Sequence, residues 1–160
     1  MANTYRKIIL HVVFAVKYRQ ALLHKSWRRN VFGYIHEAIN GRGNYCIKVG
    51  GYNDHIHILF DYKCKEPIED IVREIKKASN ILINQKYSKI KFDWQVGYGV
   101  FSVGWKELDQ MIKYVDPDFQ ERHHGKGCSF KDDYFRLLKE YEVEYKDEFV
   151  FEFFDNILDE

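Results

Sequence analysis

The sequence predicts an α+β fold, a ferredoxin-like βαββαβ sandwich followed by C-terminal helices. Three patterns support this prediction. Short segments alternate apolar and polar residues, as strands with one buried face do. Longer segments between them repeat apolar residues at helical spacing, and glycine, proline, asparagine or aspartate separate the two kinds of segment. Such a fold is an antiparallel sheet with two helices on one face, and its other face is expected to be open.

The first half of the chain is expected to hold three strands and one helix. Residues 7–17 form the first strand, one face of which carries Ile8, Leu10, Val12, Phe14 and Val16. A helix over residues 27–39 is expected to end at the glycines of residues 41–43. A second strand follows near residues 44–49, and residues 50–54 connect it to a third strand that begins near His55.

The second half adds the remaining elements of one domain over residues 1–160. Pro67 suits the first turn of the longest helix, whose apolar stripe is Ile68, Ile71, Val72, Ile75, Ser79 and Leu82. Residues 94–103 predict a fourth strand. A shorter helix follows, with Leu108, Met111, Ile112 and Val115 on its buried stripe. Residues 121–127 predict a polar loop, and residues 130–141 a last helix before an acidic, aromatic tail.

Composition excludes several classes of protein. A chain that is 46% hydrophobic with only two prolines is expected to fold. A net charge of +1 gives no strong global field, so any contact with DNA must depend on local patches. The isolated cysteines, Cys46, Cys64 and Cys128, fit neither a disulfide framework nor a cysteine zinc site. With no expected signal peptide or membrane span, they predict a cytoplasmic protein.

Two histidines share one face of the third strand. His55 and His57 alternate with Ile56 and Ile58, so both imidazoles are expected to point away from the two helices. Two imidazoles can bind one divalent metal ion and leave coordination positions open for substrate oxygens. Taken alone, two half-exposed strand histidines are the simpler explanation. Asp54 could orient one ring, although its side chain is expected on the opposite face.

A tyrosine and a histidine pair follow the fourth strand. Tyr114 lies beside the buried stripe of the short helix, so its hydroxyl is expected to reach solvent and could attack a phosphodiester. A phenol with an ordinary pKa near ~10 needs a base or a metal for this. His123 and His124 are adjacent and point apart, so they are expected to be solvated loop histidines.

Six basic residues are candidate contacts for DNA. Four of them, Arg28, Arg29, Lys76 and Lys77, are by default ordinary solvated helix residues. Lys89 and Lys91, close to Trp94, are better candidates because charge and aromatic stacking act together on a single strand.

Taken in order, several segments resemble one known family. They are HVVFAVKYR, DHIHILFDY, IVREIKKAS, DWQVGYGVFSVG, Tyr114, QERHH and SFKDDYFRLLKEYEVEY. Together they cover nearly the whole chain, which resembles the single-tyrosine HUH transposases of insertion sequences, the IS-two-hundred-like family. The resemblance implies an enzyme that cleaves and rejoins single-stranded DNA at hairpin-marked element ends through a 5′-phosphotyrosine intermediate. It also implies a Mg²⁺ or Mn²⁺ cofactor, action at the nucleoid of a prokaryotic cell, and a homodimer with merged sheets and sites shared between chains.

The resemblance assigns the metal ligands and leaves one of them open. It makes His55 and His57 ligands and Tyr114 the nucleophile. The family's glutamine ligand, four residues after the tyrosine, falls on Asp118, whereas counting back from the histidine pair places it on Gln120. Pro117 is expected to end or kink the tyrosine helix at Asp116. Gln120 is preferred because the whole segment after it then lines up with the family, and Asp118 stays an alternative because a carboxylate suits a divalent ion.

Two alternative functions are considered. One is a non-catalytic or domesticated relative of the same fold that binds hairpins or repeats. The other is a structural metal protein that uses four histidines, His55, His57, His123 and His124.

Overall fold

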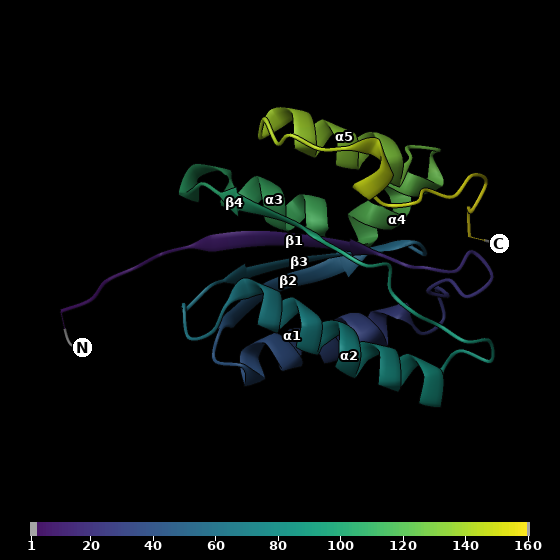
Figure 1. The fold of residues 1–160 in the computed structure, drawn as a ribbon, viewed down its shortest axis with the longest axis horizontal. Helices are drawn as coiled ribbons and strands as arrows, with labels where there is room; N and C mark the ends of the chain where they lie inside the picture. Colours follow the sequence, from purple (N-terminus) through teal and green to yellow (C-terminus); the bar gives the residue numbers. More distant parts are fainter. Residues whose placement is uncertain (1–2, 160) are drawn as a thin grey trace.

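A four-stranded antiparallel sheet lies at the centre of the computed structural model, which describes residues 3–159 (Figure 1). Its strands are β1 (Ile9–Ala15), β2 (Tyr45–Gly51), β3 (His55–Asp61) and β4 (Gly99–Val103). They lie in the order β2-β3-β1-β4, and each neighbouring pair is antiparallel. This order confirms the predicted ferredoxin-like fold.

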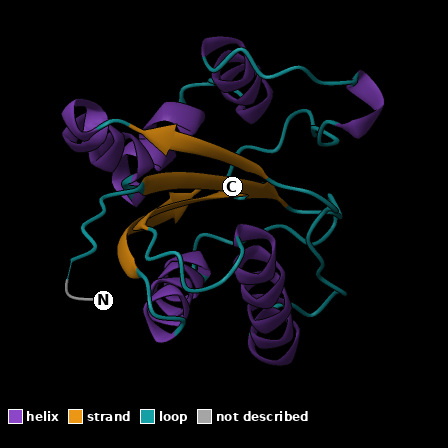
Figure 2. Ribbon diagram, turned by 60° about the vertical axis from the view of Figure 1, so that its left-hand side comes forward, coloured by secondary structure: helices purple, strands orange, loops and turns teal. Residues whose placement is uncertain are grey.

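Two helices, α1 (Arg28–Gly41) and α2 (Ile68–Lys86), cover one face of the sheet (Figure 2). Val12 and Phe14 of β1 pair in register with Ile58 and Ile56 of β3, and all four belong to the main apolar core. The helix end at Gly41 and the start of α2 after Pro67 match the sequence predictions. In the stripe of α2 the predicted Leu82 is only partly buried, and Ile83 is buried instead.

The fourth strand is shorter than predicted. Trp94 forms a single bridge with Val16, after which the chain leaves the sheet until Gly99. Lys76 of α2 holds this excursion, because its Nζ donates to the carbonyls of Gln95 at 2.8 Å and Gly97 at 2.6 Å. Val96, at the tip, is 95% exposed. These two hydrogen bonds stabilise the backbone where it departs from the strand ladder.

The second face of the sheet is covered, and the expectation of an open face is wrong. Three further helices, α3 (Leu108–Val115), α4 (Pro117–Gly125) and α5 (Phe130–Glu140), lie over it (Figure 1). The short 3₁₀ turns η1 (Trp105–Glu107) and η2 (Asp147–Phe149) complete the chain. Among residues 3–159, no helix is both long and apolar enough to cross a membrane.

The predicted polar loop over residues 121–127 is mostly helix α4. Pro117 ends α3 as predicted, because Asp116 adopts an extended conformation with φ −51° and ψ 132°. The same proline then begins α4, since a proline needs no hydrogen-bond acceptor at a first helical position. The Asp116 side chain caps α4 by accepting from the Asp118 amide at 2.9 Å. One Asp-Pro pair therefore stops one helix and starts the next.

Gly50 is the place where the second helical layer meets the sheet. The sequence places Gly50 in a connection, but it lies in β2, opposite His57, and residues 52–54 alone form the turn. A Cβ atom at Gly50 would overlap the carbonyl oxygen of Val115, the last residue of α3. Only glycine allows the corner between α3 and α4 to approach the strand this closely.

Replacing Gly50 by alanine is therefore expected to destabilise the fold by about 1–3 kcal/mol through overpacking. Urea denaturation followed by circular dichroism measures this change. Gly33→Ala is the matched control, because Gly33 lies exposed in α1 with no atom within 4 Å of an added Cβ. That control is expected to stabilise the protein by about 0.5–1 kcal/mol. Equal stability of Gly50→Ala and the wild type would contradict the close contact at Val115.

Candidate functional site

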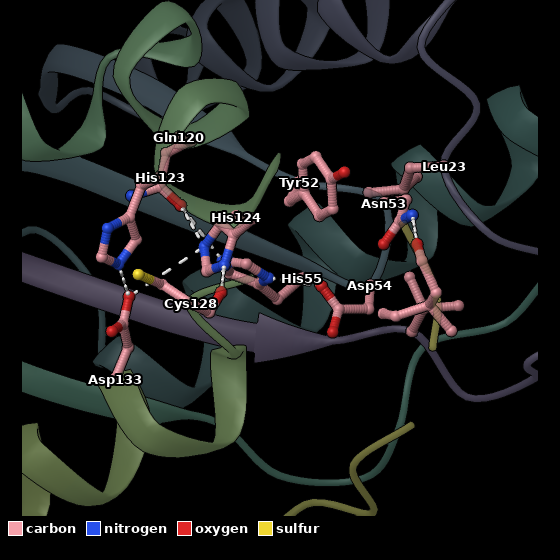
Figure 3. Close-up of polar contacts among 12 residues, drawn as sticks. Leu23, Tyr52, Asn53, Asp54, His55, Gln120, His123, His124, Cys128 and Asp133 are labelled. Atoms are coloured by element: carbon pink, nitrogen blue, oxygen red, sulfur yellow. Dashed lines mark hydrogen bonds and ion pairs between the residues drawn. The ribbon is translucent and has the colours of Figure 1, made fainter. Parts of the chain in front are cut away.

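His55 and His57 are fully enclosed between β3 and the second helical layer. Their exposed fractions are 0% and 1%, so the half-exposed strand histidines of the simpler explanation are absent from β3. Asp54 precedes the strand, and its Oδ1 lies 2.7 Å from His55 Nδ1 (Figure 3). The carboxylate therefore reaches the ring despite the expected opposite direction. Because an ionised carboxylate only accepts, Nδ1 carries the proton and a neutral His55 has its lone pair on Nε2.

His11 of β1 orients His57. Its Nε2 lies 2.8 Å from His57 Nδ1, and the two rings stack. Burial, and next the neighbouring His55, lower the pKa of His57 well below its ordinary value, and burial lowers the pKa of His11 to about 3. Both rings are thus neutral, and one donates to the other. His57 Nε2 is buried with no hydrogen-bond partner among the described residues.

His11 is a site residue that was not predicted from the sequence, although its place in the strand pattern signals it. His11 lies on β1 in the phase opposite to the apolar stripe, and therefore on the face that His55 and His57 share. Because β1 lies beside β3 in the sheet, an imidazole on this face of β1 lies next to His57.

Gln120 of α4 reaches the histidines, and Asp118 does not. The Gln120 side chain is fully buried, with Oε1 3.2 Å from His55 Nε2. Its Nε2 donates to the carbonyl of Tyr114 at 2.8 Å, which fixes the orientation of the amide. Asp118 is exposed on the other side of α4 and pairs with Arg29 at 2.6 Å. The structure thus places Gln120, the preferred third ligand, beside His55 and leaves Asp118 outside the cluster.

His124 places a further imidazole beside Gln120 Oε1. It is buried and is not the solvated loop residue that the sequence predicts. Its Nδ1 lies 2.6 Å from the carbonyl oxygen of Cys128, to which it must donate, so the lone pair of a neutral ring is on Nε2. That Nε2 lies 3.0 Å from Gln120 Oε1 (Figure 3). Burial lowers the pKa of His124 to about 4, which keeps the ring neutral.

Three lone pairs consequently converge in one buried space. They belong to His55 Nε2, His124 Nε2 and Gln120 Oε1, and each of these residues has its proton-bearing atom committed elsewhere. Facing lone pairs repel unless a cation or a proton lies between them. The distances of 3.0 and 3.2 Å to Gln120 Oε1 match adjacent ligands of an octahedral ion, which are about 3 Å apart for bonds of ~2.1 Å. The donor set therefore fits a divalent cation.

Tyr114 lies beside this cluster, at the end of α3. Its ring contacts the His57 ring edge to face, with centroids 5.4 Å apart. Its hydroxyl, expected in solvent, is partly buried and donates to Asp133 Oδ2 at 2.8 Å. Burial first, and the Asp133 charge next, raise the pKa of Tyr114 above its ordinary value. The tyrosine and the histidines thus meet within a single chain.

Asp133 of α5 links the tyrosine to the first of the tandem histidines. His123 Nε2 lies 2.7 Å from Asp133 Oδ2 (Figure 3). Tyr114 donates to the same oxygen. His123, His124 and Asp133 offer ligand atoms within 4.8 Å of one another. Asp133 could not be predicted from the sequence, because only the packing of α5 distinguishes it from its exposed neighbour Asp132.

The six basic candidates differ in their access to DNA. Arg28 is 0% exposed, stacks on the Tyr52 ring and forms two hydrogen bonds with Asp159, at 2.9 and 2.7 Å. It is not a solvated helix residue and offers no surface to a phosphate. Lys76 is committed to backbone carbonyls, and burial lowers its pKa to about 8. The exposed candidates are Arg29, which pairs with Asp118 and Glu121, and Lys77, Lys89 and Lys91.

The proton positions derived above can be tested directly. In the metal-free protein at about pH 8, where a histidine is ordinarily neutral, His55 and His124 are expected to be Nδ1–H tautomers with unprotonated Nε2 atoms. Two-bond proton–nitrogen correlation spectra distinguish the two tautomers. His24, an exposed histidine outside the site, is the reference. An Nε2–H signal from either His55 or His124 would contradict the convergence of lone pairs.

Two comparisons relate the chain to curated and solved proteins. The transposase for insertion sequence element IS200 of Salmonella typhimurium is 24% identical over 135 residues, which are 81% of this chain and 88% of that protein. The protein of the same name from Salmonella typhi matches equally.

Solved structures show the same fold. A candidate transposase from Deinococcus radiodurans R1 aligns with a TM-score of 0.54 and 20% identity, over 74% of this chain and 94% of that one. A REP-associated tyrosine transposase, solved bound to a REP hairpin, aligns with a TM-score of 0.54 and 15% identity. That alignment covers 99% of this chain and 94% of the other.

The family profile described as Transposase IS200 like matches residues 4–118, a span that includes both strand histidines and Tyr114. Because this match covers more than half of the chain, the protein belongs to the IS200-like transposase family.

Proposed function

We propose that this transposase cleaves and rejoins single-stranded DNA, with Tyr114 as the nucleophile and a divalent metal ion as cofactor. The observation that carries the proposal is the convergence of Tyr114, His55, His57 and Gln120 in one buried cluster of a single chain. Buried polar groups are expensive to maintain without partners, so their assembly around shared space favours a ligand. The family relationship supports a reaction on DNA.

His55, His57 and Gln120 would hold the ion. Two observations support this assignment: the convergence of lone pairs at Gln120 Oε1 and the unpartnered Nε2 of His57. Mg²⁺ and Mn²⁺ both accept imidazole and amide oxygen ligands, and such an ion polarises a phosphate when bound. His124 Nε2 is a further donor beside the same oxygen.

The chain's own residues orient the site. Asp54 accepts from His55 Nδ1. His11 would accept from His57 Nδ1 when the ion is bound, which leaves both Nε2 lone pairs free for it. In the proposed reaction, Tyr114 Oη forms a bond to the scissile phosphorus as the phenolic proton passes to a hydrogen-bonded acceptor. The bond to the 3′ oxygen breaks, and that oxygen takes a proton from water to become a 3′-hydroxyl. The result is a 5′-phosphotyrosine, which a 3′-hydroxyl can attack to rejoin strands without an external energy source.

The proposed substrate is single-stranded DNA with hairpins near the element ends. The solved neighbour bound to a REP hairpin supports this choice. Exposed basic residues, Arg29, Lys77, Lys89 and Lys91, are the proposed phosphate contacts. A homodimer with exchanged tyrosine helices stays a prediction, and the single chain already brings its own Tyr114 to its own histidines.

A covalent adduct tests the enzyme against a non-catalytic hairpin-binding protein. A labelled strand that carries the palindromes flanking the gene, incubated with protein and Mn²⁺, is expected to give a protein–DNA adduct on a denaturing gel. Tyr114→Phe is expected to abolish the adduct and to retain hairpin binding. Tyr34→Phe, at an exposed tyrosine of α1, is the matched control and is expected to behave as wild type. Hairpin binding by wild type with no adduct would instead indicate a non-catalytic relative.

Metal binding by two variants tests the third ligand. Gln120→Ala is expected to weaken Mn²⁺ binding by at least ~10-fold, because it removes one of the three proposed ligands. Asp118→Ala, at the exposed carboxylate of the same helix, is expected to leave the affinity unchanged. Electron paramagnetic resonance of free Mn²⁺ during titration of the DNA-free protein measures both affinities. The reverse order of effects would assign the third ligand to Asp118.

A further inference from the structure

Asp133 of α5 holds the hydroxyl of the proposed nucleophile. Tyr114 Oη donates to Asp133 Oδ2 at 2.8 Å, and since a carboxylate accepts, the phenolic proton lies between these two oxygens. We infer that Asp133 is a catalytic residue, which takes this proton when Tyr114 attacks the phosphate and returns it when strands are rejoined. The inference rests on the proposed function and adds a base to it. The family profile ends at residue 118, before Asp133.

The fold fixes the Asp133 carboxylate from several sides. The residue is buried in the first turn of α5, where Ser129 caps the helix by accepting from the Asp132 amide. His123 Nε2 donates to the same oxygen as Tyr114, at 2.7 Å. Arg136, one turn further along α5, lies 3.7 Å from the other oxygen. A buried carboxylate with fixed partners loses little entropy in accepting a proton and stays aligned with Tyr114.

The attack on the phosphate requires such a base. A phenol in this partly buried position is protonated at rest, and a protonated phenol is a weak nucleophile. As the bond from Tyr114 Oη to phosphorus forms, the Oη–H bond breaks and its proton moves to Asp133 Oδ2. The electron pair of the broken phosphorus–oxygen bond goes to the leaving 3′ oxygen, which is protonated by water. In rejoining, Asp133 returns its proton to Oη as tyrosine leaves.

His123 acts through Asp133 and is a positioning residue. By donating to Oδ2, it keeps the carboxylate turned toward Tyr114. Two other roles for the cluster make different predictions. If Asp133 instead held Tyr114 in an inactive position, its removal would accelerate cleavage. If the cluster of His123, His124 and Asp133 instead bound the metal ion, removal of the Asp133 charge would weaken Mn²⁺ binding.

The test uses Asp133→Asn in the full chain, because asparagine keeps the shape and an acceptor oxygen but is not a base. Single-turnover adduct formation with the labelled hairpin strand and saturating Mn²⁺ is expected to slow by about 10²–10⁴-fold. Rejoining by a purified adduct is expected to slow as well, while hairpin binding and Mn²⁺ affinity stay at wild-type values. Asp132→Asn, one residue away and exposed, is the matched control with wild-type rates expected. His123→Phe is expected to slow the adduct by about tenfold, the effect of one charge-assisted hydrogen bond.

A rescue experiment separates a base from a merely structural carboxylate. Incorporation of a fluorinated tyrosine at position 114 makes the phenol more acidic, so it depends less on a base. It is expected to restore part of the rate lost in Asp133→Asn. No rescue, wild-type or faster cleavage by Asp133→Asn, or a loss of Mn²⁺ affinity would each overturn the inference. These outcomes bear on Asp133 only if the wild-type protein forms the adduct through Tyr114. If the wild type forms no such adduct, the proposed function itself is refuted.

Discussion

The contact between Gly50 and the carbonyl of Val115 is the constraint on which the site depends. It lets the corner between α3 and α4 approach β2 more closely than any side chain would allow. Tyr114 immediately precedes this corner, and Gln120 lies about one turn into α4. The Asp116-Pro117 pair redirects the chain there, so the nucleophile and the amide oxygen arrive on the same side of β3.

Hydrogen-bond partners at the edge of the cluster fix the positions of its protons. Asp54 and the carbonyl of Cys128 each take the Nδ1 proton of one histidine, and the carbonyl of Tyr114 takes an amide hydrogen of Gln120. Every outer hydrogen bond therefore turns a lone pair inward. Burial also lowers the pKa of His57 and His124, which disfavours the protonated forms of these two rings. Converging lone pairs in a buried space favour the proposed divalent cation.

Tyr114 lies at the junction between this cluster and a second, acidic one. Its ring contacts His57, whereas its hydroxyl turns toward Asp133 and His123. The two contacts separate the two needs of the proposed reaction: charge stabilisation at the phosphate and removal of the phenolic proton. The separation depends on α4 and α5, because His123 and Asp133 come from these helices.

The sequence by itself determined the βαββαβ order, the shared face of His55 and His57, and the break at Pro117, because periodicity and proline chemistry are local. Only the tertiary structure decided that the second face is covered, that α4 replaces a loop, and that Gln120 rather than Asp118 meets the histidines. It also decided the roles of His11 and Asp133 and the burial of Arg28 against Asp159. These outcomes depend on contacts between residues far apart in the chain, which no local pattern specifies.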